Sequence, residues 1–94
     1  MRLPKKIDFG GYILKIEYAE KVMVNADECF GVYNPETKTI SLSKGMSRIR
    51  KKEVFIHEYL HFIEDVYRIK ISEENISTFA LAILKLISEV DLNG

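Results

Sequence analysis

The spacing of apolar residues changes near the middle of this chain, and that change restricts the possible folds more than any other feature. In residues 12–18 apolar side chains occupy every second position, which is the period of a half-buried strand. From about residue 48 they recur every three or four positions, which is the period of an amphipathic helix. We therefore expect an α+β protein, with a small antiparallel or mixed sheet in the N-terminal half followed by two helices.

Turn-forming residues divide the N-terminal half into short strands. Gly10-Gly11 separates Ile7–Phe9 from Tyr12–Tyr18, and a glycine pair between two segments rich in β-forming residues indicates a turn. Asn25–Glu28 consists mainly of polar residues and is expected to be a loop.

A second hairpin is predicted further along the chain. Asn34–Lys38 contains Asn-Pro and lies between the strand-like runs Cys29–Tyr33 and Thr39–Ser43. In the last run Ile40 and Leu42 share one face, and hydroxyl side chains occupy the other. This one-sided pattern predicts that Thr39–Ser43 lies at an edge of the sheet, where an extended peptide could pair with it.

Two helices are predicted in the C-terminal half. Lys44-Gly45-Met46 interrupts the strand pattern, and Ser47 can cap a helix over residues 48–68. A second helix begins after Ser72 and ends near residue 89. The apolar face of the first helix contains Phe55, Ile56, Tyr59, Leu60, Ile63, Val66 and Tyr67. That of the second contains Ile76, Phe79, Ala80, Ile83, Leu84 and Ile87.

The composition is typical of one globular domain, here residues 1–94, because 94 residues suffice for one compact domain and not for two. Fourteen basic residues balance fourteen acidic ones, so nucleic acid is not expected as a partner. Cys29 is the one cysteine, which excludes an internal disulfide. The apolar stretch Phe79–Ile87 is too short to span a bilayer, and no apolar signal segment follows the basic N-terminus. A cytoplasmic protein without membrane association is expected.

Residues His57-Glu58-Tyr59-Leu60-His61 form a His-Glu-x-x-His motif within the first predicted helix, and the chain's two histidines both belong to it. The i, i+4 spacing puts the two imidazoles on one helix face, where they can bind one Zn²⁺ at about 2.0–2.1 Å. Glu58 projects about 100° from His57, so it can reach a water at the ion more easily than it can join the ligands. The alternative is an ordinary solvated helix face. Four charged residues share the polar stripe of the histidines: Arg50, Glu53, Glu64 and Arg68.

With this motif on a helix that follows a strand-rich segment, the chain resembles the zincin superfamily. More narrowly, it resembles the minimal metallopeptidase-like proteins of phages and prophages. Besides the motif, the resemblance includes Gly10-Gly11-Tyr12, Gly31 followed by Thr39-Ile40-Ser41-Leu42, and Ser72-Glu73-Glu74. It implies a zincin-like fold, bound zinc, hydrolysis of peptide or protein amide bonds, and Glu58 as the catalytic base.

A catalytic zinc usually has three protein ligands, so an acidic residue is expected beside the two histidines. Glu53 and Glu64 lie too far along the helix axis to converge with both histidines on one ion. Glu73 and Glu74 remain, in the first turn of the second helix, where the helix dipole favours acidic residues even without a metal. Glu73 lies nearer to the core-facing side and is the predicted ligand, in line with the gluzincin type of zincin. Glu74 projects about 100° further round and stays the alternative.

The predicted function is that of a zinc-dependent metallopeptidase with a peptide or protein substrate. Glu58 would accept a proton from water during attack on the substrate carbonyl, and could return it to the leaving nitrogen. The alternative class is a non-catalytic module that binds zinc for stability, or a regulator that acts only with a partner. Basic residues in segment 48–52 could bind a substrate carboxylate or an acidic partner, or form ordinary solvated surface. Cys29 is expected to be a small buried residue.

Overall fold

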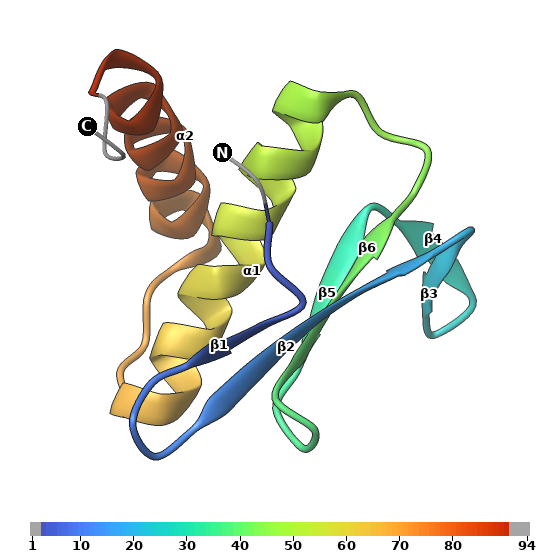
Figure 1. Ribbon diagram of the computed structural model, residues 1–94, viewed down its shortest axis with the longest axis horizontal. Helices are drawn as coiled ribbons and strands as arrows, with labels where there is room; N and C mark the ends of the chain where they lie inside the picture. The colour runs from blue at the N-terminus through green and yellow to red at the C-terminus, as the bar shows by residue number, and fades with distance from the viewer. Residues whose placement is uncertain (1–2, 91–94) are drawn as a thin grey trace.

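A computed structural model describes residues 3–90, with a strand-rich N-terminal half followed by two helices (Figure 1). The strands are β1 (Lys6–Asp8), β2 (Ile13–Ala19), β3 (Val22–Val24), β4 (Asp27–Cys29), β5 (Gly31–Asn34) and β6 (Thr39–Ser43). The helices are α1 (Arg48–Tyr67) and α2 (Glu73–Glu89). This layout confirms the α+β fold predicted from the spacing of apolar residues. Of the helices described, none has the length and apolarity that crossing a membrane requires.

The main sheet is mixed, with four strands in the order β1-β2-β6-β5. β1 pairs antiparallel with β2, β2 parallel with β6, and β6 antiparallel with β5. β6 therefore has a partner on both sides, and the prediction that Thr39–Ser43 lies at an edge is wrong. Its one-sided pattern has another cause. Ile40 and Leu42 are fully buried in the core, whereas the serines between and after them point to the opposite, uncovered face of the sheet. The edge strand on this side is β5.

The prediction that Asn25–Glu28 is a loop is right for Asn25 and Ala26 and wrong for Asp27 and Glu28, which belong to a strand of a small hairpin. β3 and β4 pair antiparallel, with Val24 opposite Asp27, and form a separate two-stranded sheet. Between them Asn25 and Ala26 adopt left-handed conformations, with φ of 50° and 71°, as a two-residue hairpin turn requires. Asn-Ala is not a preferred pair for a two-residue hairpin turn, and Asp and Glu are uncommon in strands. The sequence pattern therefore did not reveal this hairpin.

Both helices begin at their predicted caps. The Ser47 hydroxyl accepts a hydrogen bond from the Arg50 N–H at 3.2 Å, and the Ser72 hydroxyl accepts one from the Asn75 N–H at 3.2 Å. These bonds satisfy backbone donors that have no partner inside the helix. α1 ends before Arg68, whose left-handed conformation (φ 54°) turns the chain toward α2.

α1 packs on one face of the sheet, and α2 packs on α1 (Figure 1). The core lies between the sheet and the helices. Tyr67 was expected on the buried face of α1 but is 68% exposed. Phe62 was not expected on that face but is fully buried. The sheet and α2 contact α1 from different directions, so the buried arc of α1 is wider than a single apolar stripe. The core side chains are Leu14, Ile16, Tyr33, Ile40, Leu42, Val54, Phe55, Ile56, Leu60, Phe62, Ile76 and Ala80.

Gly31 allows β5 to approach α1 closely. A Cβ atom on Gly31 would lie 2.6 Å from Val54 Cγ1 and 3.1 Å from Leu42 Cδ2. Both distances are shorter than the 3.5–4.0 Å at which carbon atoms make favourable contact. Val54 lies one turn before Glu58 on α1, so this contact helps to set the distance between the edge strand and the motif.

We predict that Gly31→Ala lowers the free energy of unfolding by about 1–3 kcal/mol, because the new methyl group overpacks the contact with Val54. Urea denaturation measures this loss. In Gly31→Ala/Val54→Ala the clashing methyl group is gone, so the double variant should lose less stability than the sum of the two single variants. Gly11→Ala is the matched control, since a Cβ there meets nothing within 4 Å. Equal effects of the two glycine substitutions would contradict this account of Gly31.

Candidate metal centre

His57 and His61 lie one turn apart on α1, with their ring centroids 5.2 Å apart. Their side chains are 25% and 27% exposed, so the ring nitrogens can be reached from outside. Together with Glu58 they form a group whose ligand atoms, one from each residue, lie within 4.8 Å of one another. Within residues 3–90 no other set of three such side chains meets this distance, and Glu73 is not a member of the set.

Glu73 approaches both histidines from the first turn of α2. Its Oε2 lies 3.4 Å from His57 Nε2, and its Oε1 lies 3.1 Å from His61 Nε2. Glu74, the alternative, is exposed and makes no ion pair with any described residue. The fold thus brings Glu73, rather than its neighbour, to the two imidazoles.

These separations fit a shared metal ion. Two donors that each lie about 2.0–2.1 Å from a tetrahedral ion are about 3.3–3.4 Å apart. The two contacts between histidine and Glu73, at 3.4 and 3.1 Å, are close to that value. Imidazole nitrogens and a carboxylate are also the donor types that zinc prefers. The residues present therefore suit a zinc ion.

Glu64 fixes the orientation of His61. His61 Nδ1 lies 2.7 Å from Glu64 Oε1, and the other carboxylate oxygen accepts a hydrogen bond from the Ile71 N–H at 2.9 Å. That backbone hydrogen bond, and then the contact with His61, lowers the pKa of Glu64 below its ordinary value. An ionised carboxylate at Nδ1 favours a proton there, which leaves the Nε2 lone pair free for a metal. With Glu73 beside Nε2 as well, His61 has carboxylates at both ring nitrogens.

Glu58 points to the other side of the histidines, toward β5. Its Oε1 accepts a hydrogen bond from the Tyr33 N–H at 3.0 Å. Burial raises the pKa of Glu58 from 4.5 to about 7, and the Glu73 carboxylate adds to the rise. His61 and the Tyr33 N–H oppose it by stabilising the anion. A carboxyl group with a pKa near neutrality is suited to exchange a proton with a reacting group.

The sequence did not single out the interaction that holds Tyr33 in place. The Tyr33 hydroxyl donates to Asp65 Oδ2 at 2.6 Å, and Lys38 Nζ donates to the same oxygen at 2.6 Å. Tyr33 is therefore fixed to α1 at two points, by its backbone N–H to Glu58 and by its hydroxyl to Asp65. Burial, and then the bond to Asp65, raises the Tyr33 pKa, so the hydroxyl stays protonated as a donor. The partners lie 25–32 positions apart, and no local pattern connects them.

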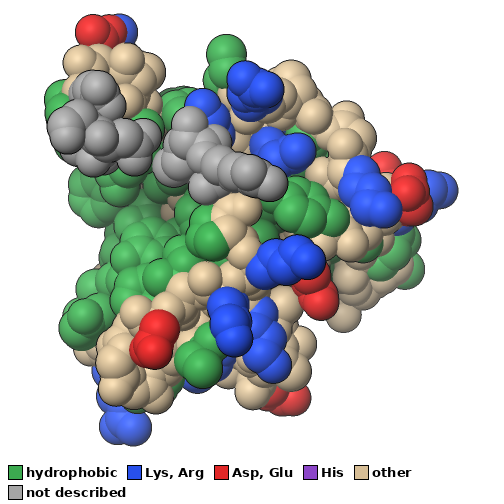
Figure 2. All heavy atoms as spheres, in the orientation of Figure 1, with side chains coloured by type: hydrophobic (Ala, Val, Ile, Leu, Met, Phe, Trp, Pro, Cys, Tyr) green, Lys and Arg blue, Asp and Glu red, His purple; other side chains and the backbone are tan. Residues whose placement is uncertain are grey.

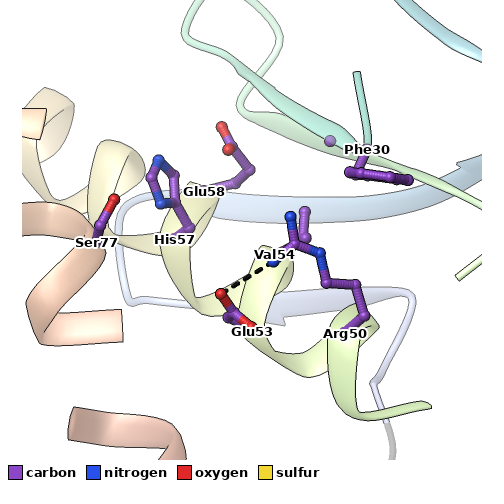
Figure 3. Close-up of a pocket in the computed structure, with 8 residues that line it drawn as sticks. Phe30, Arg50, Glu53, Val54, His57, Glu58 and Ser77 are labelled. Atoms are coloured by element: carbon purple, nitrogen blue, oxygen red, sulfur yellow. Dashed lines mark hydrogen bonds and ion pairs between the residues drawn. The ribbon is translucent and has the colours of Figure 1, made fainter. Parts of the chain in front are cut away.

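Glu58 borders two grooves that lie on either side of it. The groove on the His57 side has a volume of about 330 Å³. Figure 3 shows His57 and Glu58 projecting from α1, with Ser77 of α2 beyond His57 and Phe30 across from Val54. The groove on the His61 side has a volume of about 510 Å³. It is lined by Val32, Tyr33, Pro35, Glu58, His61, Glu64, Asp65, Ile69 and Lys70.

The basic segment 48–52 is partly neutralised by neighbouring side chains. The Arg50 guanidinium pairs with Glu53 at 3.0 Å and lies 5.2 Å from the centre of the Phe30 ring (Figure 3). Lys51 Nζ lies 5.2 Å from the centre of the Tyr18 ring. These contacts turn Arg50 toward the groove and Lys51 toward the sheet.

Cys29 lies outside the group that could hold a metal. Its side chain is partly buried, and its thiol donates to the Val22 carbonyl at 3.5 Å. Burial raises its pKa, and the Glu58 charge adds to the rise, which keeps the thiol protonated. Cys29 was expected to be a small buried residue, and the structure shows it partly buried.

No family model, curated protein or solved structure matches this chain. The zincin resemblance therefore rests on the motif, its position in an α+β fold and the side chains around it. Membership of a zincin family stays a prediction.

We predict that Asp65→Asn lowers the free energy of unfolding by about 1–2 kcal/mol at neutral pH, because two hydrogen bonds to an ionised acceptor are weakened. The Lys38 and Tyr33 hydrogen bonds hold the Asp65 pKa below its ordinary 3.8. The stability that this carboxylate supplies is therefore present above about pH 4, and is lost as the pH falls through the lowered pKa.

Urea titrations of wild type and Asp65→Asn at pH 7 and at about pH 3 measure this difference. It should shrink at the lower pH. Asp27→Asn serves as the control, because Asp27 is exposed and makes no ion pair with a described residue. A difference that stays constant or grows toward low pH would contradict the ionised role of Asp65.

Proposed function

We propose that this protein is a zinc-dependent hydrolase of peptide or protein amide bonds. In this proposal His57, His61 and Glu73 hold the ion, and Glu58 is the general base. The observation that supports it most directly is the position of the Glu73 carboxylate, 3.4 Å from His57 Nε2 and 3.1 Å from His61 Nε2. A cytoplasmic location, expected from the sequence, belongs to the same proposal.

In the proposed chemistry, one residue transfers protons and other residues bind the metal. Zinc, when bound, would supply a Lewis acid for an amide carbonyl and for water. Glu58 accepts a proton from the attacking water through its carboxylate and then delivers this proton to the leaving nitrogen. Glu64 keeps the His61 ring oriented through Nδ1. The Tyr33 N–H keeps the Glu58 carboxylate beside the edge strand.

The substrate is proposed to lie along β5, in place of the β6 edge expected from the sequence. The Ser43 N–H donates to the Phe30 carbonyl, so the alternation of an antiparallel ladder directs the backbone groups of Gly31 and Tyr33 away from β6. An extended peptide could pair with the outward backbone groups of β5 other than the Tyr33 N–H, which donates to Glu58. The two grooves that meet at Glu58 would then receive side chains from both sides of the scissile bond.

A non-catalytic zinc site is the second candidate, and one observation favours it. Glu58 lies within the same 4.8 Å group as the two histidines, so it could act as a ligand itself. With Glu73 as the fourth ligand, the site would be closed, as in structural zinc sites. The grooves on both sides of Glu58 favour the catalytic role, because they leave the carboxylate accessible to a substrate.

Glu73→Gln should weaken zinc binding at least tenfold, whereas Glu74→Gln should have little effect. The reason is that only the Glu73 carboxylate lies beside the two imidazoles, and its negative charge would be lost. Competition with a chromophoric chelator gives the zinc affinity of both variants. Glu74→Gln is the matched control, since it removes the same charge from the same helix turn. A selective loss in Glu74→Gln would transfer the ligand role to that residue.

The role of Glu58 is tested by Glu58→Gln, which is nearly isosteric and can still accept the Tyr33 hydrogen bond. We expect the variant to keep one zinc per chain and to lose hydrolysis by a factor of about 10²–10⁴, because the proton acceptor is gone. Zinc is measured by elemental analysis, and hydrolysis on any peptide that wild type cuts in a diverse library.

The outcomes separate the two candidates. Loss of zinc in Glu58→Gln would make Glu58 a ligand and support the structural site. Retained zinc with undiminished cleavage would contradict the role of Glu58 as the base.

A further inference from the structure

An apolar groove beside α2 plays no part in the proposed function. It has a volume of about 240 Å³ and lies between the N-terminal strand region, α1 and α2. Ile7 and Phe9 contribute from the strand side, Tyr59 from α1, and Ile83 and Ile87 from α2. Figure 2 shows hydrophobic side chains gathered over α2 and the hollow beside it, with charged side chains toward the margins.

Next to this groove α2 carries a ridge of exposed apolar side chains. Phe79, Leu86 and Val90 are 46%, 57% and 42% exposed. At 100° per residue Phe79 and Leu86 lie within about 20° of one another on the helix circumference, on the flank that also carries Ile83. Val90 follows directly as the C-cap residue of the helix. Glu73, which faces the histidines, projects about 100° or more away from Phe79 and Leu86. The ridge and the groove therefore occupy one side of α2, and the candidate metal centre occupies the other.

We infer that this apolar surface is the interface between two copies of the chain, related by a two-fold axis. The α2 ridge of one protomer packs into the groove of its partner, and the reverse contact forms at the same time. A two-fold interface uses the same patch on both subunits, so it requires a projection and a recess on one face. The ridge and groove beside α2 provide both.

The size of the patch fits a small dimer. Phe9, Phe79, Leu86 and Val90 leave between 37% and 57% of their surface in water. At about 200 Å² for each large side chain, that amounts to roughly 350–400 Å². A standard interface buries about 800 Å² per partner, of which about 65% is apolar in homodimers. The half-buried side chains that line the groove, such as Ile83 and Ile87, add to this apolar area.

The character of the surface favours a second copy over a different partner. Interfaces between independently stable proteins are about as polar as the rest of the surface, whereas homodimer interfaces are more apolar. The groove is lined by aliphatic and aromatic side chains alone. The chain has fourteen basic and fourteen acidic residues, so no net charge opposes the approach of two copies.

The test compares two leucines on α2 that are equally exposed. Leu86, on the ridge, is 57% exposed, and Leu81, on the other flank, is 54% exposed. Sedimentation equilibrium of the full chain from micromolar to millimolar concentration should give a dimer for wild type. Leu86→Glu should raise the dissociation constant about 100-fold or more, because a charge enters the apolar contact in both protomers. Leu81→Glu should stay dimeric.

Circular dichroism establishes whether each variant is folded. If Leu86→Glu does not fold, Phe79→Ser provides a second variant of the ridge. A monomeric wild type throughout the range would overturn the inference, as would equal dissociation constants for Leu86→Glu and Leu81→Glu. Zinc content of the same samples reports on the metal site separately. Since the ridge lies away from the histidines, Leu86→Glu should bind as much zinc as wild type even when it is monomeric.

Discussion

The contact between β5 and α1 determines the geometry on which the rest of the candidate site depends. Gly31 leaves no Cβ between the strand and Val54, so the edge strand lies directly against the motif helix. Glu58 then accepts the Tyr33 N–H, and Asp65, two turns later, accepts the Tyr33 hydroxyl. One strand residue is thus attached to both ends of a two-turn segment of α1. That segment includes His61, so the strand, Glu58 and the His61 imidazole are fixed relative to one another.

Several acidic side chains gather around His61, and this arrangement would favour a bound cation. Glu58, Glu64 and Glu73 surround His61, and Glu58 is buried enough that its pKa is raised to about 7. Glu64 is stabilised by the Ile71 N–H, and Asp65 nearby is neutralised by Lys38. Glu73 has no such partner besides the two imidazoles. Its carboxylate is largely exposed, and a metal ion bound between it and the histidines would stabilise it there.

The sequence predicted those features that depend on local patterns. Ser47 and Ser72 were identified as caps, and the orientation of Glu73 followed from helical geometry. The order of the strands could not be predicted in this way, because alternation along Thr39–Ser43 shows which face is buried and not how many neighbours the strand has. The Tyr33–Asp65 contact was missed for a similar reason. It joins residues 32 positions apart, and only the packing of β5 on α1 brings them together.

The second helix connects the two functional surfaces of the molecule. Only Ile76 and Ala80 of α2 are fully buried, so packing on α1 alone fixes a small part of its surface. At its first turn, a metal ion shared by Glu73 and the histidines would add a second attachment to α1. Along one flank, the contact of Phe79, Leu86 and the C-cap residue Val90 with a partner would cover surface that the monomer leaves exposed. Since a domain of 94 residues buries a limited share of its surface, both attachments would stabilise the same weakly anchored element. Dimerisation would therefore favour the position of α2 that metal binding requires, even though the two surfaces share no residue.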